Sequence, residues 1–139
     1  MHSLRNLVVG TDFSPAADAA LDFAVALAKR GDAAITLVHV CEQIPGGCDD
    51  PATEAAILDV CGVKLLAACA RFANAGVAIT PVLRSGVVAD KIHNVATEVG
   101  ASLIVIGRAS RGSLGRTTEH VLRTATRSVA IHMPLEMHP

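Results

Sequence analysis

One short run of apolar residues constrains the fold more than any other feature of the chain. Leu103–Gly107 places four large aliphatic side chains, three of them β-branched, directly before a glycine. Such a run is typical of a strand buried on both faces of a parallel sheet. After a turn, Val121, Leu122 and Ala125 return at helical spacing. A strand, a glycine-containing turn and a helix form the arrangement in which backbone N–H groups can hold a phosphate.

The turn after this strand is rich in arginine. Arg108, Arg111 and Arg116 lie in or beside it, and guanidinium groups suit an anionic ligand. The same composition also fits an ordinary solvated loop, because every parallel sheet has such turns and Gly and Ser are common in them. The turn by itself therefore leaves a phosphate site and a plain surface loop both open.

Predicted strands and helices alternate along the whole chain. Strands are expected at 4–9, 34–40, 77–83, 103–107 and 128–132, and helices at 15–30, 52–75, 87–99 and 117–125. Strands separated by helices predict right-handed crossovers and an open parallel sheet with helices on both faces. No linker or repeat divides residues 1–139, which are therefore expected to form one domain. Pro81 lacks an N–H and places the third strand at a sheet edge.

The helix ends carry local signals. Ser14 is expected to cap the first helix, with Pro15 at its first position and Gly31 as its C-cap. Gly100 is expected to close the third helix. The residues predicted to line the buried side of the long second helix are Ile57, Cys61, Leu65, Ala68 and Phe72.

Composition excludes some function classes. Hydrophobic residues make up 51% and charged residues 18% of the chain, which indicates a packed rather than a disordered protein. Tyr and Trp are absent and the net charge is -1, so stacking on bases and general attraction to nucleic acid are not expected. Without a signal-peptide pattern or a run of about 20 apolar residues, we expect a cytoplasmic protein with no membrane partner.

Cysteine and histidine spacing predicts no metal site. The four Cys contain no CxxC pair, and the six His show no ligand spacing. The cysteines of a cytoplasmic chain are expected to be thiols. His39, at a predicted strand end, is expected to make a structural hydrogen bond rather than to act in catalysis.

In folds of this kind the ligand lies beyond the carboxyl ends of the strands, where the strand order reverses. That rule brings together four parts of the sequence. They are the turn at 11–12, the strand end at 39–40, the turn at 86–88 and the turn that follows Gly107.

With these parts placed, the chain resembles the universal stress proteins of the UspA superfamily over essentially its whole length. The segments that carry the resemblance are VVGTDFS at 8–14, AAL at 19–21, LVHV at 37–40, Gly86 with Ile92, LIVIG at 103–107 and VLR at 121–123. The resemblance implies an α/β fold with a five-stranded parallel sheet in strand order 3-2-1-4-5. It also implies a homodimer paired through the last strand, around Val129, Ala130 and Ile131.

One branch of this family binds ATP through the motif G-x-x-G, nine residues, then G-[ST]. Gly107 matches the first glycine, but Ser110 stands at the second, and serine lacks the freedom of glycine at positive φ. Alignment on 121–123 makes the loop about five residues shorter than the motif and puts Gly115 and Arg116 in place of the final G-[ST]. The resemblance therefore implies a degenerate phosphate loop.

The nucleoside end matches the family better. Asp12 matches the aspartate that contacts the nucleoside, Val40 a residue of the base pocket, and Val88 the pocket floor. ATP or another adenine nucleotide is the implied ligand, with Mg²⁺ only if a di- or triphosphate binds. The complete implied nucleotide-binding set is Thr11, Asp12, Val40, Val88, Gly107, Ser110, Arg111, Gly112, Ser113 and Gly115.

A second hypothesis remains beside this one. The broken glycine motif supports a stress protein that binds no nucleotide and acts through dimerisation and protein partners, with a vestigial pocket. Enzymatic activity is not expected beyond a slow ATPase, because that reaction needs a metal site and a positioned water, and Asp12 is the one obvious acid near the turn.

Overall fold

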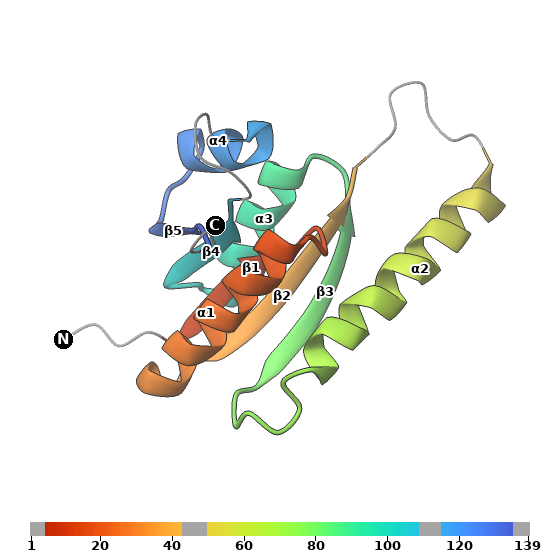
Figure 1. The fold of residues 1–139 in the computed structure, drawn as a ribbon. Coiled ribbons are helices and arrows are strands. Elements are labelled where there is room, and N and C mark those ends of the chain that lie inside the picture. The colour runs from red at the N-terminus through yellow and green to blue at the C-terminus, as the bar shows by residue number, and fades with distance from the viewer. Residues whose placement is uncertain (1–4, 43–49, 109–114, 135–139) are drawn as a thin grey trace, which may run out of the picture.

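The computed structural model describes residues 5–42, 50–108 and 115–134 (Figure 1). Strands and helices alternate through these residues, as the sequence predicts. In chain order they are β1 (Asn6–Gly10), α1 (Pro15–Gly31), β2 (Ala34–Cys41), α2 (Pro51–Ala70), β3 (Ile79–Ser85), α3 (Val88–Val99), β4 (Leu103–Gly107), α4 (Arg116–Arg123) and β5 (Val129–His132).

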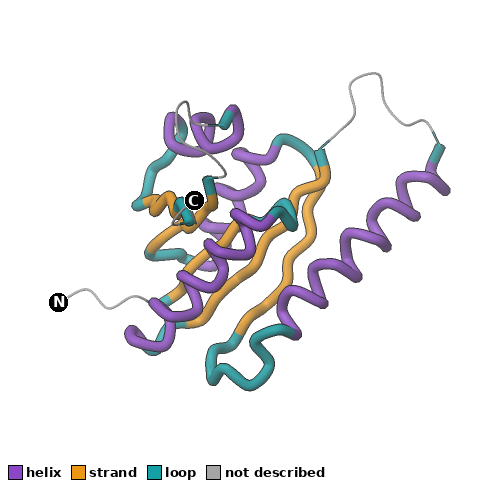
Figure 2. The backbone as a smooth tube through the Cα atoms, viewed as in Figure 1, coloured by secondary structure: helices purple, strands orange, loops and turns teal. Residues whose placement is uncertain are grey.

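The five strands form one parallel sheet in the order β3-β2-β1-β4-β5, which confirms the predicted fold class (Figure 2). The order reverses between β1 and β4, so a crevice is expected at their carboxyl ends. Pro81 lies in β3 at the sheet edge, as predicted. β3 begins at Ile79, two residues later than expected, and residue 4, the predicted start of the first strand, lies outside the described residues.

The sheet is buried on both faces. Leu7 and Val9 of β1 pack with α1 and α2, while Val8 between them packs with α3 and α4 on the other face. Ile104 and Val105 of β4 divide between the two faces in the same way. This two-sided burial is the physical reason why β1 and β4 read as continuous apolar runs.

The ends of α1 confirm one prediction and correct another. Ser14 Oγ accepts a hydrogen bond from the N–H of Ala17 at 3.2 Å, as expected of an N-cap. The predicted C-cap was wrong: Gly31 belongs to the last helical turn, and Asp32 adopts the left-handed conformation with φ 52° and donates its N–H to Ala28 O. Aspartate tolerates this region better than most residues, so the glycine signal pointed one residue too early. Gly100 does close α3, with φ 63°.

α2 ends at Ala70, five residues before the predicted end, and buries less than expected. Leu65 and Ala68 are buried, Cys61 and Phe72 are half-buried, and Ile57 is 42% exposed. Figure 1 shows the reason: α2 lies along the edge strand β3, and its N-terminal half extends away from the sheet. Among the described helices, none is long and apolar enough to cross a membrane.

Candidate functional site

A cleft of about 780 Å³ lies at the carboxyl ends of the central strands. This volume is within the range of small-molecule sites. The described residues that line it include six of the predicted nucleotide-binding set: Thr11, Asp12, Val40, Val88, Gly107 and Gly115. Ser110, Arg111, Gly112 and Ser113, also in that set, lie outside the described residues. The structure therefore brings the first six together, and their role in binding stays a prediction.

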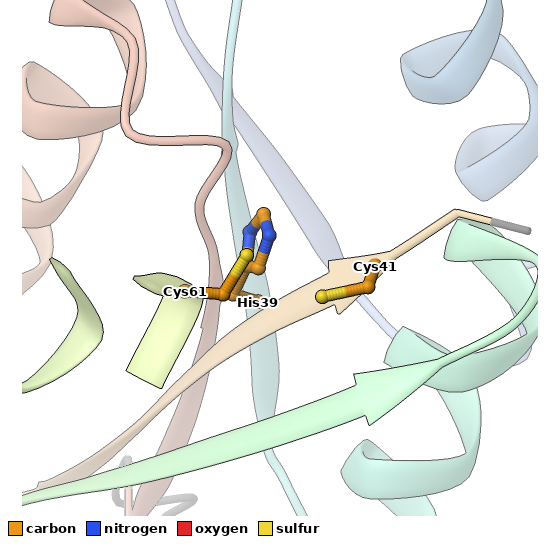
Figure 3. A group of neighbouring side chains, drawn as sticks. All are labelled: His39, Cys41 and Cys61. Carbon is orange, nitrogen blue, oxygen red and sulfur yellow. The ribbon is translucent and has the colours of Figure 1, made fainter. Parts of the chain in front are cut away.

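The end of β2 supplies a cluster that the sequence analysis missed. His39 and Cys41 are two residues apart and so lie on the same face of the strand. Cys61 reaches the same place from α2, and one ligand atom from each of the three side chains lies within 4.8 Å of the others (Figure 3). The spacing of two along one strand was the available signal, but a partner 20 residues further on, in a helix, has no recognisable pattern.

A hydrogen bond to the neighbouring turn fixes the imidazole of His39. His39 Nδ1 lies 2.7 Å from Thr11 O. Because a carbonyl oxygen can only accept, Nδ1 carries the proton and donates it, and neutral His39 keeps its lone pair on Nε2. The Phe13 ring packs against the imidazole, with centroids 4.4 Å apart. The structural hydrogen bond expected for this histidine is thus present.

The two cysteines of the cluster affect one another. Burial raises the pKa of the Cys41 thiol to about 11, and a hydrogen bond with Cys61 and the charge of Cys61 add to this shift. Cys41 is therefore a protonated thiol at neutral pH.

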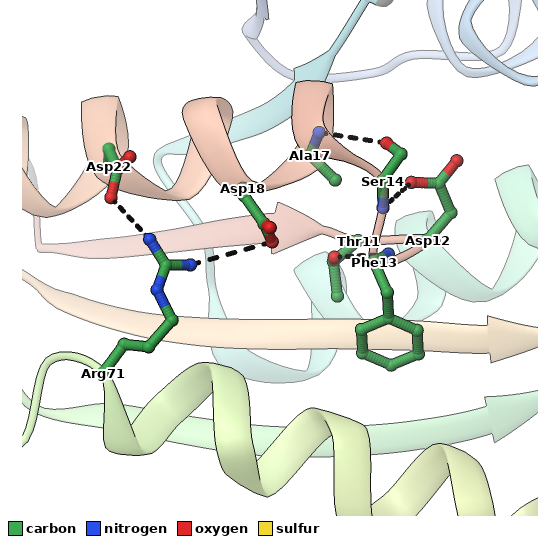
Figure 4. A network of polar contacts seen from close by, with 8 residues as sticks. All are labelled: Thr11, Asp12, Phe13, Ser14, Ala17, Asp18, Asp22 and Arg71. Atoms are coloured by element: carbon green, nitrogen blue, oxygen red, sulfur yellow. Dashed lines mark hydrogen bonds and ion pairs between the residues drawn. The ribbon is translucent and has the colours of Figure 1, made fainter.

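Asp12, which lines the cleft, lies in the turn between β1 and α1 (Figure 4). Thr11 N–H donates to Val38 O at 2.9 Å, and Thr11 Oγ1 accepts from Phe13 N–H at 3.0 Å. Asp12 Oδ1 accepts from Ser14 N–H at 3.0 Å. Phe13 has φ 65°, a conformation that non-glycine residues seldom adopt. These bonds fix an exposed carboxylate where it can accept hydrogen bonds from a ligand's hydroxyl or amino groups.

Gly107 has a packing role that its place in a phosphate motif does not reveal. A Cβ at this position would lie 2.5 Å from the backbone oxygen of Ala16. Only glycine therefore allows the end of β4 to approach the first turn of α1 so closely. This requirement explains the glycine whether or not a phosphate binds beside it.

The first turn of α4 also lines the cleft. Gly115 is the N-cap of this helix and provides no side-chain cap, while Arg116, Thr117 and Thr118 follow it along the cleft wall. The first N–H groups of a helix lack partners within the helix and carry partial positive charge. Arg108 and Arg116 line the cleft, as do Asp12 and Glu42, so its lining contains both positively and negatively charged residues.

The strand order and the position of the cleft define an open, doubly wound α/β domain with a ligand-sized site at its topological switch point. The sequence profile of the Universal stress protein family matches residues 3–132. The chain therefore belongs to the universal stress protein family.

A relative and a solved structure agree with this assignment. Universal stress protein Sll1654 of Synechocystis is 34% identical over 125 residues, which cover 90% of this chain and 78% of that protein. A universal stress family protein from Burkholderia pseudomallei superimposes with a TM-score of 0.78 at 31% identity, covering 93% of this chain and 96% of the other.

Two further solved structures contain nucleotides. A universal stress protein in complex with cAMP has a TM-score of 0.72 at 24% identity and covers 95% of this chain and 98% of its own. The universal stress protein of Archaeoglobus fulgidus in complex with dAMP has a TM-score of 0.68 at 24% identity, with coverage of 94% and 98%. At this identity the likeness establishes the shared fold.

Proposed function

We propose that this universal stress protein binds an adenine nucleotide in the cleft at the β1/β4 switch point, and that a nucleotide with one phosphate fits better than ATP. The observation that carries the proposal is the pairing, in one cleft, of the fixed Asp12 carboxylate with the start of α4, whose N-cap Gly115 has no side chain. The cAMP and dAMP complexes of proteins with the same fold support it.

Each part of the cleft has a role in this proposal. Asp12 accepts hydrogen bonds from the ribose, and Val40 and Val88 provide apolar walls for the base. The first N–H groups of α4 and the Arg116 guanidinium hold the phosphate. The sequence between Gly107 and Gly115 is shorter than the triphosphate motif of the family, which is why one phosphate is favoured over three. Mg²⁺ would take part only with a di- or triphosphate.

Thermal unfolding with AMP, cAMP, ADP and ATP tests the proposal. A ligand at about 100 times its Kd stabilises the folded state by about 2.7 kcal/mol. We expect the largest shift with AMP or cAMP, and its loss in Asp12→Asn. This variant keeps the Oδ1 atom that accepts from Ser14 N–H, so the turn is retained. Asp59→Asn, an exposed change in α2 away from the cleft lining, is the matched control and should leave the shift unchanged.

The absence of any shift at millimolar nucleotide would contradict the proposal. That result would favour the alternative, a stress protein that binds no nucleotide and acts through dimerisation and protein partners. A shift of equal size in wild type and Asp12→Asn would instead contradict the role given to Asp12.

A homodimer through β5 is part of the same proposal. In the described sheet β5 is the outermost strand beside β4, and Val129, Ala130 and Ile131 are all only half-buried. An apolar edge strand favours pairing with a second chain. Sedimentation at micromolar concentration should give the mass of two chains, and a monomeric mass would contradict this part.

A further inference from the structure

The strongest unassigned feature of the molecule is the group formed by His39, Cys41 and Cys61. All three residues are half-buried and line the cleft. Their ligand atoms, all within 4.8 Å of one another, belong to two thiols and an imidazole. This donor set is the one preferred by thiophilic cations such as Zn²⁺ and Cu⁺.

The imidazole is already held as a metal-ligating histidine would be. Its Nδ1–H donates to Thr11 O at 2.7 Å, which leaves the Nε2 lone pair available. Histidine ligands in metal sites usually donate their other ring N–H to a carbonyl or carboxylate, which fixes both tautomer and ring orientation. Phe13 restrains the ring further by packing against it.

We propose that His39, Cys41 and Cys61 form a three-ligand site for Zn²⁺, with the fourth coordination position open to the cleft. Zn–S bonds of about 2.3 Å and a Zn–N bond of about 2.0 Å put tetrahedral ligand atoms about 3.5–3.8 Å apart. One ligand atom from each side chain already lies within 4.8 Å of the others, and rotation of the side chains would bring them to these shorter separations. Each thiol that binds Zn²⁺ releases its proton to solvent, so the metal is held by thiolates.

Three protein ligands with one open position are typical of zinc sites that bind water or a further ligand. Asp12 lines the same cleft as the three ligands. The proposal of a metal site does not depend on the proposal of nucleotide binding, because the metal ligands come from β2 and α2 and require no phosphate-binding loop.

Titration of the reduced protein with Co²⁺, followed by displacement with Zn²⁺, tests the site. The chain has no Trp or Tyr, so a thiolate-to-Co²⁺ charge-transfer band stands on a low ultraviolet background. We expect one ion per chain. Removing a residue that only hydrogen-bonds to a metal ligand commonly lowers the metal affinity by about 10–100-fold. Cys41→Ser and Cys61→Ser remove ligands themselves, so each should lower the affinity by more than about 100-fold.

Cys69→Ser is the matched control. Cys69 is a second half-buried cysteine of α2, but it packs against the core on the α1 side of the sheet and does not line the cleft. Its substitution should leave the Co²⁺ band and the affinity unchanged. Cys48 lies outside the described residues, so the titration is repeated with the Cys48→Ser variant. Retained metal binding would support the three-ligand assignment, and lost binding would overturn it.

Several results would overturn the proposal. One is the absence of a thiolate band in the reduced wild-type protein; another is equal affinity in wild type and Cys61→Ser. A Cys41–Cys61 disulfide formed without reductant, together with no metal binding in the reduced protein, would reassign the pair to thiol oxidation. Circular dichroism of each variant, with Cys61→Ala as a second substitution in α2, separates loss of the site from loss of folding.

Discussion

The helices α1 and α2 begin with the same local chemistry and end in different environments. Each has a polar N-cap, Ser14 or Asp50, followed by a proline at the first position. Of the 17 residues of α1, seven are buried, whereas only two of the 20 residues of α2 are. Helix formation was therefore predictable for both, but the extent of burial was not.

The difference follows from where each helix lies on the sheet. α1 covers the centre, and its first turn packs against the end of β4 at Gly107. α2 runs along the edge strand β3 (Figure 1), so much of its surface meets solvent. Arg71 joins the two helices by an ion pair to Asp22 at 3.0 Å, but both side chains are exposed (Figure 4), and such pairs contribute little. α2, the less buried of the two helices, is also the one that brings Cys61 to the cleft.

The largest expected effects come from leucines on the two helices. Leu21→Ala in α1 and Leu65→Ala in α2 remove side chains that are at most 2% exposed, and each should lower the free energy of unfolding by about 2–5 kcal/mol. Leu66, next to Leu65, is 61% exposed, so Leu66→Ala should change it by less than about 0.5 kcal/mol. Urea denaturation measures all three. A large loss in Leu66→Ala would show that another surface covers this face of α2 in solution.

Substituting the glycine of β4 that contacts α1 and the glycine within α2 should change the stability in opposite directions. Gly107→Ala forces a Cβ against Ala16 O and should cost about 1–3 kcal/mol, because the backbone must shift. A Cβ added to Gly62, within α2, would meet no atom of the described residues within 4 Å, so Gly62→Ala should gain about 0.5–1 kcal/mol from helix propensity. Thermal unfolding compares the two, and a loss of stability in Gly62→Ala would contradict the open surroundings assigned to α2.

A smaller effect is expected at the start of α1. Ser14→Ala removes the hydroxyl that accepts from Ala17 N–H and should cost about 1 kcal/mol. Ser14→Gly is the matched comparison, because glycine at an N-cap costs only a few tenths of a kcal/mol relative to serine. Urea denaturation of both variants checks the cap, and equal stability of Ser14→Ala and wild type would show that this hydrogen bond is unimportant.

The smallest effect is a pH dependence at the start of α2. The hydroxyl of Thr53, and next the N–H of Ala52, lower the pKa of the Asp50 carboxyl below its usual value. A lowered pKa in the folded state means that the stabilisation is complete above the ordinary aspartate pKa and is lost as pH falls through the lowered value. Asp50→Asn should remove this part of the pH dependence. Identical acid unfolding curves for the two proteins would contradict it.

Much of the fold could be predicted, because its signals are local. Apolar runs marked β1 and β4, Pro81 marked an edge strand, and Gly100 marked the end of α3. The resemblance to universal stress proteins supplied the strand order. The C-cap at Asp32 was missed because Asp and Gly can both adopt the left-handed conformation, and the sequence offered them side by side.

The candidate site also has one part that could be predicted from the sequence and one part that could not. Thr11 and Asp12 follow a predicted strand directly, so their place at the switch point could be deduced from the order of elements. The cluster of His39, Cys41 and Cys61 could not, because it depends on which face of β2 each residue occupies and on how α2 is rotated.

The positions of helices and strands were already specified by the amino-acid sequence, since caps, turns and apolar runs act over a few residues. Which surfaces are covered, and which distant residues meet, depended instead on how the elements pack. Ile57 was expected inside and is 42% exposed. The N-terminal half of α2 extends away from the sheet (Figure 1). The approach of Cys61 to Cys41 likewise results from packing between a helix and a strand, and no local rule specifies such packing.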